Sequence, residues 1–148
     1  MSKTSRTCCP ADPTAMQVLE GPGWRLCLDG DRVPYAVLIG GGVADSVDWA
    51  AEFTMDEAQA LRRAASTLVG QHRSLLASLM EEEAIDLSME LPCGEGDLWV
   101  ALEGDRHRWS LSFVLSPGGG RRGIEGRWGT QASEALAAAL DTLLDSQD

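Results

Sequence analysis

The sequence lacks long hydrophobic runs and paired cysteines. No stretch approaches the ~18 consecutive apolar residues of a membrane-spanning helix, and the N-terminal residues lack the apolar core of a secretory signal. The four cysteines (Cys8, Cys9, Cys27 and Cys93) form no Cys-x-x-Cys pair, the spacing typical of zinc sites and thiol-exchange enzymes. We therefore expect a cytoplasmic protein with reduced thiols and no membrane partner.

Side chains that commonly carry catalysis are also scarce. The chain has 2 histidines, no His-x-x-x-His pair and no Asp-x-Asp-x-Asp loop, so no metal-binding set is visible. His72 falls on an apolar helical stripe without an accompanying nucleophile or second base, which favours a hydrogen-bonded core position over a switch or a ligand. The run Gly118–Gly120 leads into a strand pattern and lacks the Gly-Lys-Ser/Thr ending of a phosphate loop. We expect no enzyme activity, no cofactor and no metal.

Positive charge is in short supply. There are 12 lysines and arginines against 23 aspartates and glutamates, and the net charge is -11. This balance repels nucleic-acid phosphates and anionic membranes at long range, although it allows a local basic patch. The length of 148 residues is that of one typical domain with its own core.

An internal repeat is present. Leu28-Asp-Gly-Asp-Arg32 recurs as Leu102-Glu-Gly-Asp-Arg106. Each copy leads into a short apolar run, three glycines, a tryptophan, a threonine and then an amphipathic helical pattern. The chain therefore reads as strands followed by a helix, written twice.

The repeat sets the expected domain organisation. Residues 1–17 are polar, contain Pro10 and Pro13 and show no periodicity, so we expect a disordered tail. Residues 18–148 are expected to form a single domain made of two repeats, about 20–83 and 84–146.

Alternating apolar residues predict three strands in the first repeat, near 24–28, 33–39 and 47–53. Pro34 favours an edge position for the second of these. The capping box Thr54-Met-Asp-Glu57 begins a helix that is expected to run to about Met80.

The second repeat predicts four strands, near 85–91, 98–102, 109–115 and 121–128, and then a helix over 132–144. The continuous apolar run Leu98–Leu102 indicates a central strand covered on both faces. The expected fold is α+β, a βββα-ββββα pseudo-repeat with antiparallel sheets backed by two helices.

Arginines gather in one expected hairpin, residues 106–127. The hairpin holds one acid, Glu125, and five arginines: Arg106, Arg108, Arg121, Arg122 and Arg127. Strand alternation predicts that Arg108, Arg121 and Arg127 share a solvent face with Ser110 and Ser112. Guanidinium groups can hold phosphates or carboxylates bidentately, or can pair with the acids of their own chain.

The aromatic residues weaken the case for nucleic acid. Binders of single strands need aromatic platforms for the bases. Here Trp109, Phe113 and Trp128 alternate toward the expected core, and only Trp99 and Tyr35 are left open. We therefore expect a protein-interaction module, or a self-associating one. The alternative is a single-stranded nucleic-acid binder that uses the five arginines.

Several short segments of this sequence together resemble the cyanobacterial domain-of-unknown-function family 1818. The segments, in order, are Glu20-Gly-Pro-Gly-Trp-Arg-Leu26, Val37-Leu-Ile-Gly-Gly41, Gln71-His72, Leu79-Met-Glu-Glu82, Gly104-Asp105, Arg108-Trp-Ser-Leu111 and Arg122-Gly-Ile-Glu-Gly-Arg-Trp128. The resemblance spans about residues 18–146. It implies a fold similar to the Whirly and transcriptional-coactivator type of single-stranded-DNA-binding domain, in which ββββα units form curved antiparallel sheets backed by helices. It implies no activity and no catalytic residues.

Overall fold

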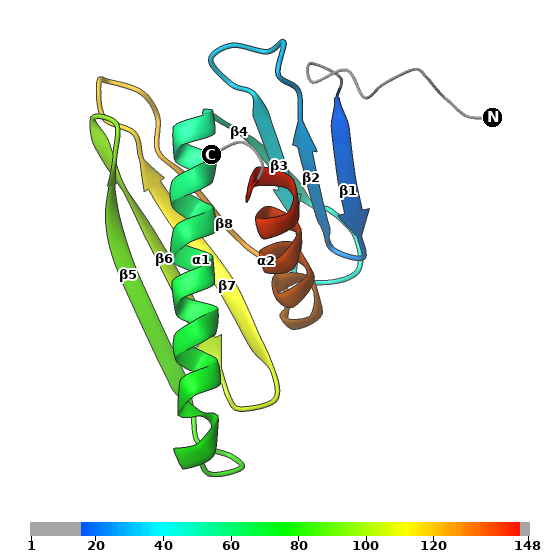
Figure 1. The fold of residues 1–148 in the computed structure, drawn as a ribbon, viewed down its shortest axis with the longest axis vertical. Helices are drawn as coiled ribbons and strands as arrows, with labels where there is room; N and C mark the ends of the chain where they lie inside the picture. Colours follow the sequence, from blue (N-terminus) through cyan, green and yellow to red (C-terminus); the bar gives the residue numbers. More distant parts are fainter. Residues whose placement is uncertain (1–15, 146–148) are drawn as a thin grey trace, which may run out of the picture.

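Residues 16–145 are described by a computed structural model, in which two four-stranded antiparallel sheets are backed by two main helices (Figure 1). The elements, in chain order, are β1 (Gln17–Gly21), β2 (Trp24–Leu28), β3 (Val37–Gly41), β4 (Trp49–Phe53), α1 (Met55–Leu75), the 3-10 turn η1 (Leu76–Ser78), β5 (Ile85–Cys93), β6 (Gly96–Gly104), β7 (Trp109–Ser116), β8 (Ile124–Arg127) and α2 (Thr130–Leu144). The α+β class and the repeated strands-then-helix order are confirmed.

The first sheet has the order β1-β2-β3-β4, one strand more than expected. β1 pairs with β2 from Gln17 opposite Leu28 to Gly21 opposite Trp24. Leu19 is the one half-buried apolar side chain of β1, so no alternating pattern marks this strand in the sequence. Gln17 already belongs to a strand, whereas residues 1–15 of the expected tail lie outside the described residues.

The edge position expected from Pro34 is wrong. β3 begins at Val37 and lies between β2 and β4. Pro34 lies in the loop before the strand, where the sheet needs no hydrogen bond from its nitrogen.

The second sheet has the order β5-β6-β7-β8, so β6 is internal as expected. Leu98, Val100 and Leu102 are fully buried on the face that the helices cover. The expectation that β6 is covered on both faces is wrong, because Trp99 and Glu103 on the other face are exposed. The strand is therefore half-buried, like its neighbours.

The predicted capping box begins α1. The Thr54 hydroxyl accepts the N–H of Glu57 at 3.1 Å, and the Glu57 carboxylate accepts the N–H of Thr54 at 2.9 Å. α1 ends at Leu75 and a 3-10 turn follows, so the helix stops short of Met80.

The two helices pack between and against the sheets (Figure 1). α1 lies along β5 and β6, and α2 contacts α1, β7 of the second sheet and β2 of the first. Each sheet therefore keeps one face toward the helices and one face away from them. Neither helix is long and apolar enough to cross a membrane.

Four aromatic rings join the two sheets. Trp49 and Phe53 of β4 both pack against Phe113 of β7, and Trp128 packs against Trp49 and Phe113, with ring centroids 5.3 to 5.6 Å apart. The Trp128 indole N–H donates to the carbonyl of Gly40 at 3.1 Å. Both repeats consequently contribute to one cluster of buried residues.

Candidate functional site

The five arginines of hairpin 106–127 lie in three places. Arg106 and Arg108 precede β7, Arg121 and Arg122 follow it, and Arg127 ends β8. β7 is 8 residues long. A strand of that length separates its two ends by about 25 Å. The five side chains therefore do not converge on one patch.

The loop before β7 is held by its own hydrogen bonds. The Asp105 carboxylate accepts the backbone N–H of His107 at 2.8 Å and that of Arg108 at 2.9 Å. These two bonds, from Arg108 first, lower the pKa of Asp105. Arg106 donates to the carbonyl of Leu79 at 3.1 Å, which ties the loop to the chain after α1.

His72 connects the same loop to α1. Its Nε2 lies 2.9 Å from the carbonyl oxygen of Asp105, and its ring packs on Trp109 with centroids 5.8 Å apart. The side chain is 6% exposed. The expected hydrogen-bonded core position is confirmed.

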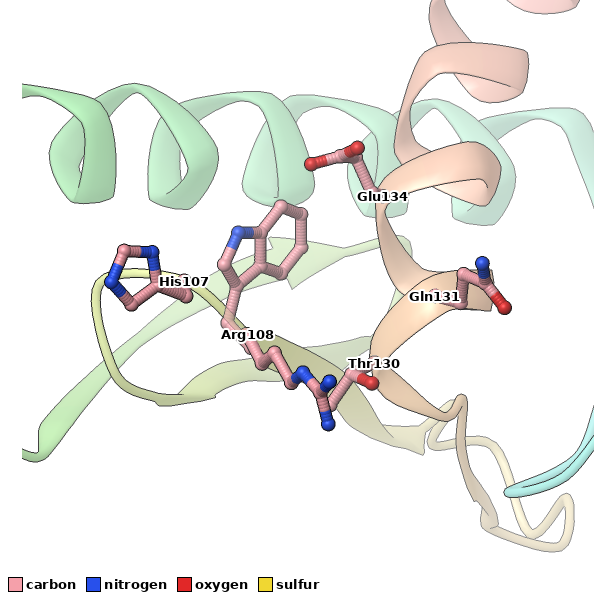
Figure 2. Close-up of a pocket in the computed structure, with 6 residues that line it drawn as sticks. His107, Arg108, Thr130, Gln131 and Glu134 are labelled. Atoms are coloured by element: carbon pink, nitrogen blue, oxygen red, sulfur yellow. The ribbon is translucent and has the colours of Figure 1, made fainter.

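Arg108 borders a cavity of about 360 Å³ between this loop and the start of α2 (Figure 2). Thr130, Gln131 and Glu134 line the helix side. Figure 2 shows Arg108 and Glu134 on opposite sides of the opening, so its wall carries both signs of charge. The cavity therefore lacks the uniformly positive lining that an anion site uses.

Arg121 faces the first turn of α1. Its guanidinium donates to the Tyr35 hydroxyl at 3.4 Å and lies 3.6 Å from the buried Glu57 carboxylate. The Tyr35 hydroxyl, followed by the charge of Glu57, raises the pKa of Arg121. This position departs from the expected face, because Arg121 does not join Arg127 beside Ser112.

Arg122 is exposed and shares with Arg121 a cavity of about 510 Å³. Leu115 and Ile124 form part of its apolar lining, and Glu52 and Glu57 contribute carboxylates. Both signs of charge again line the opening.

Arg127 lies on the second sheet opposite Ser112, as alternation predicts. We name the side of β5 to β8 that faces away from the helices the outer sheet face. Arg127 is the one basic side chain that these four strands place on it. The same strands place five carboxylates there, on Asp86, Glu90, Asp97, Glu103 and Glu125.

None of these five carboxylates takes part in an ion pair within residues 16–145. Other acids of the chain are paired: Glu52 binds Arg32, and Asp141 lies 3.2 Å from Arg62. The outer sheet face is therefore acidic because its charges are left uncompensated.

Trp99 lies near the middle of this acidic face. Its cross-strand neighbours are Glu90 on β5 and Val114 on β7. The side chain is 38% exposed. On the same face of β6 its neighbours are Asp97 and Ala101, and the small Ala101 leaves one flank of the indole without a large side chain.

The repeat contains a signal that places Trp99. Aligning Leu28 with Leu102 pairs Trp24 with Leu98, and both of these side chains face the core. Trp99 comes one position later and therefore lies on the opposite face of its strand. The acidity of the outer sheet face has a similar signal in the sequence. Asp86, Ser88 and Glu90 alternate with apolar residues and therefore lie on one face of β5.

The described residues show no grouping that suits metal or nucleophilic chemistry. Within 16–145, no three His, Cys, Asp or Glu side chains gather as they do around a metal ion. Cys27 and Cys93 are buried free thiols. Burial, followed by the charge of Glu57, raises the pKa of Cys93, which disfavours the reactive thiolate.

A solved structure is similar to this protein over most of both chains. A solved structure similar to this one has a TM-score of 0.72 and 29% identity, and the match covers 87% of this chain and 98% of the other. It is described as the crystal structure of a protein with unknown function from the DUF155 family, from Prochlorococcus sp. NATL2A, at 1.80 Å resolution.

No curated protein matches the chain. The comparisons do not test the expected similarity to the Whirly fold, which stays a prediction. The model of the domain of unknown function DUF1818 matches residues 19–143, most of the chain. With its fold and its repeat, this match makes the chain a member of the DUF1818 family.

Proposed function

We propose that this protein is a non-enzymatic binding module whose outer sheet face binds a basic surface of a protein partner. The observation that carries the proposal is the position of Trp99, which is exposed beside the carboxylates of Glu90 and Asp97, and neither carboxylate has an ion-pair partner within residues 16–145. A half-exposed indole on a regular strand offers a large apolar anchor whose backbone is already ordered.

Two physical effects support this function. Buried tryptophans are among the side chains that contribute most to protein interfaces, because they remove a large apolar area from water. Unpaired carboxylates around the anchor steer and select a partner of opposite charge. The net charge of -11 adds to this attraction at long range.

The alternative partner, single-stranded nucleic acid, is less well supported. Its binding would draw on Arg106, Arg108, Arg121, Arg122 and Arg127, which lie in three places, and some of which are engaged with Leu79, Tyr35 and Glu57. The aromatic side chain that is open for stacking on the second sheet, Trp99, lies beside the carboxylates of Glu90 and Asp97, which repel phosphates. We place the module in the cytoplasm, which suits the free thiols Cys27 and Cys93.

Affinity capture with matched variants tests the proposal. Tagged wild-type protein, Trp99→Ala and Val18→Ala are incubated with nuclease-treated native lysate, and the bound proteins are quantified. Val18 is the control because it is 37% exposed, as Trp99 is 38% exposed, but lies on the first sheet. We expect basic proteins to be retained by the wild type and by Val18→Ala, and to be lost with Trp99→Ala.

A charge-reversal variant separates the two classes of partner. Arg121→Glu combined with Arg122→Glu leaves the outer sheet face untouched and is expected to keep the partners. Capture from untreated lysate that nuclease treatment removes, and that this double variant abolishes while its circular dichroism stays that of the wild type, would reject the proposal in favour of nucleic-acid binding.

A further inference from the structure

The longest free edge in the described chain is that of β5. This strand has 9 residues and pairs on one side alone, with β6. The other edge strands, β1, β4 and β8, have 5, 5 and 4 residues. A long strand edge presents unpaired N–H and C=O groups that can form hydrogen bonds with another chain.

The hairpin register identifies the backbone groups at this edge. β5 and β6 join through two residues, and the turn closes on the pair Cys93 and Gly96. Residues that flank a two-residue turn exchange hydrogen bonds, and every second residue repeats this pattern. The odd-numbered residues of β5 therefore bond β6, and Asp86, Ser88 and Glu90 direct their N–H and C=O groups to the free edge.

Pro92 agrees with this assignment. It is even-numbered, so the N–H that proline lacks would have pointed away from β6. Among residues 85–91, no proline and no inward-facing charge protects the edge.

At the free edge, the side chains of β5 lack apolar cover on one face of the sheet and ion-pair partners on the other. On the helix side, Leu87, Met89 and Leu91 are only half-buried, whereas the equivalent residues of β6 are fully buried. On the outer sheet face, Asp86 and Glu90 are exposed carboxylates with no ion-pair partner in the described chain.

We propose that β5 accepts an extended segment of the partner protein as an added strand, in which basic residues alternate with apolar residues. The basic residues of the added strand lie beside Asp86 and Glu90, and the apolar ones cover Leu87, Met89 and Leu91. This inference rests on the proposed function. It adds the conformation and the sequence pattern of the bound segment.

A second copy of this chain does not fit the edge. The outward side chains of β5 from Asp86 to Glu90 are Asp86, Ser88 and Glu90, so none is basic. Pairing two β5 strands would bring these carboxylates together on one face in any central register, and like charges opposite each other destabilise a strand pair. A basic partner removes the repulsion that a second copy would create.

The test uses two labelled synthetic peptides of equal composition. One alternates arginine with valine, and the other has its arginines and its valines in separate blocks. Binding is measured by fluorescence anisotropy for the wild type, Ser88→Pro, Ser88→Ala and Trp99→Ala. Ser88→Pro removes an N–H at the free edge without removing a hydrogen bond to β6, and Ser88→Ala is the matched control.

We expect the alternating peptide to bind more tightly than the block peptide. Ser88→Pro should weaken the alternating peptide by about tenfold or more, because backbone hydrogen bonds to the added strand are lost, and Ser88→Ala should leave it unchanged. Amide hydrogen exchange of the wild type gives a readout that does not depend on folding of the proline variant. The amides of Asp86, Ser88 and Glu90 should become protected when the alternating peptide binds.

Four results would overturn the inference. Equal binding of both peptides, weakened by Trp99→Ala but not by Ser88→Pro and without protection of the edge amides, rejects strand addition and leaves the proposed function standing. No binding of either peptide, or binding indifferent to Trp99→Ala, rejects the proposed function as well. A dimer that Ser88→Pro dissociates would show that a second copy occupies the edge.

Discussion

At the scale of the residue, a tryptophan of this protein lies in the core or in solvent according to the face of its strand. Trp128 is 0% exposed and donates its indole N–H to Gly40. Trp99 occupies the opposite face of the second sheet and is 38% exposed. The two side chains have the same chemistry, so their surroundings alone separate the structural role of Trp128 from the binding role that we propose for Trp99.

This contrast predicts different effects on stability. Trp128→Ala should lower the free energy of unfolding by about 3–5 kcal/mol, because it leaves a cavity among Trp49 and Phe113. Trp99→Ala should lower it by less than about 1 kcal/mol. Urea denaturation followed by circular dichroism measures both values. Similar losses for the two variants would mean that Trp99 is a structural residue.

Two glycines give a second residue-scale prediction. A Cβ at Gly41 would lie 2.4 Å from the Trp128 ring, whereas a Cβ at Gly70 in α1 meets nothing within 4 Å. Gly41→Ala should therefore destabilise by about 1–3 kcal/mol through overpacking. Gly70→Ala should stabilise by about 0.5–1 kcal/mol, since it reduces the freedom of the unfolded chain. Thermal unfolding ranks the two variants, and the reverse order would contradict the packing described around Trp128.

At the scale of the element, strands and helices follow the sequence pattern more closely than loops do. Alternation correctly placed Trp109, Phe113 and Trp128 in the core, and Arg127 beside Ser112. Alternation does not extend into loops, where tertiary contacts decide direction. Arg121 contacts Tyr35 and Glu57, which lie more than sixty positions earlier in the chain. No local sequence pattern predicts that contact.

The loop between β6 and β7 predicts a pH dependence. The pKa of Asp105 is lowered in the folded chain, because its carboxylate accepts two backbone N–H bonds, those of Arg108 and His107. Its ionised form therefore stabilises the fold above the ordinary pKa of 3.8, and this contribution is lost as pH falls through the lower folded value.

Asp105→Asn should thus lower the melting temperature most at neutral pH, and the gap from the wild type should narrow below about pH 4. Differential scanning calorimetry from pH 7 to pH 2 measures the gap. Asp86→Asn, on the outer sheet face, serves as the control. A gap for Asp105→Asn that stays constant across this range would show that the ionised carboxylate does not hold the loop.

At the scale of the whole molecule, the sequence predicts the architecture better than it predicts the surface. The two strands-then-helix units follow from alternation, from the Thr54–Glu57 capping box and from the repeated Leu-x-Gly-Asp-Arg word. The sequence does not predict β1, because the apolar residues of this strand do not alternate with polar ones. The acidic outer sheet face requires knowing that β5 to β8 form one sheet in that order, which alternation within single strands does not reveal.

The molecule has two sheets, and their outer faces differ. In the first sheet, Glu20 and Arg25 pair at 3.7 Å and Glu52 binds Arg32, so the charged side chains of its strands are compensated. The second sheet carries five carboxylates on the face that exposes Trp99, and none of them has such a partner within the described residues. Under the proposed function, this asymmetry would direct a basic partner to one side of the molecule.

Site-specific photo-cross-linking tests the central claim, that the outer sheet face is the binding surface, most directly. A photoreactive amino acid replaces Val114, the cross-strand neighbour of Trp99, in one sample and Arg122 in another, and cross-linked species are identified after irradiation in native lysate. We predict cross-links to a basic protein from position 114 and none from position 122. Cross-links to nucleic acid from position 122, with none from position 114, would contradict the account.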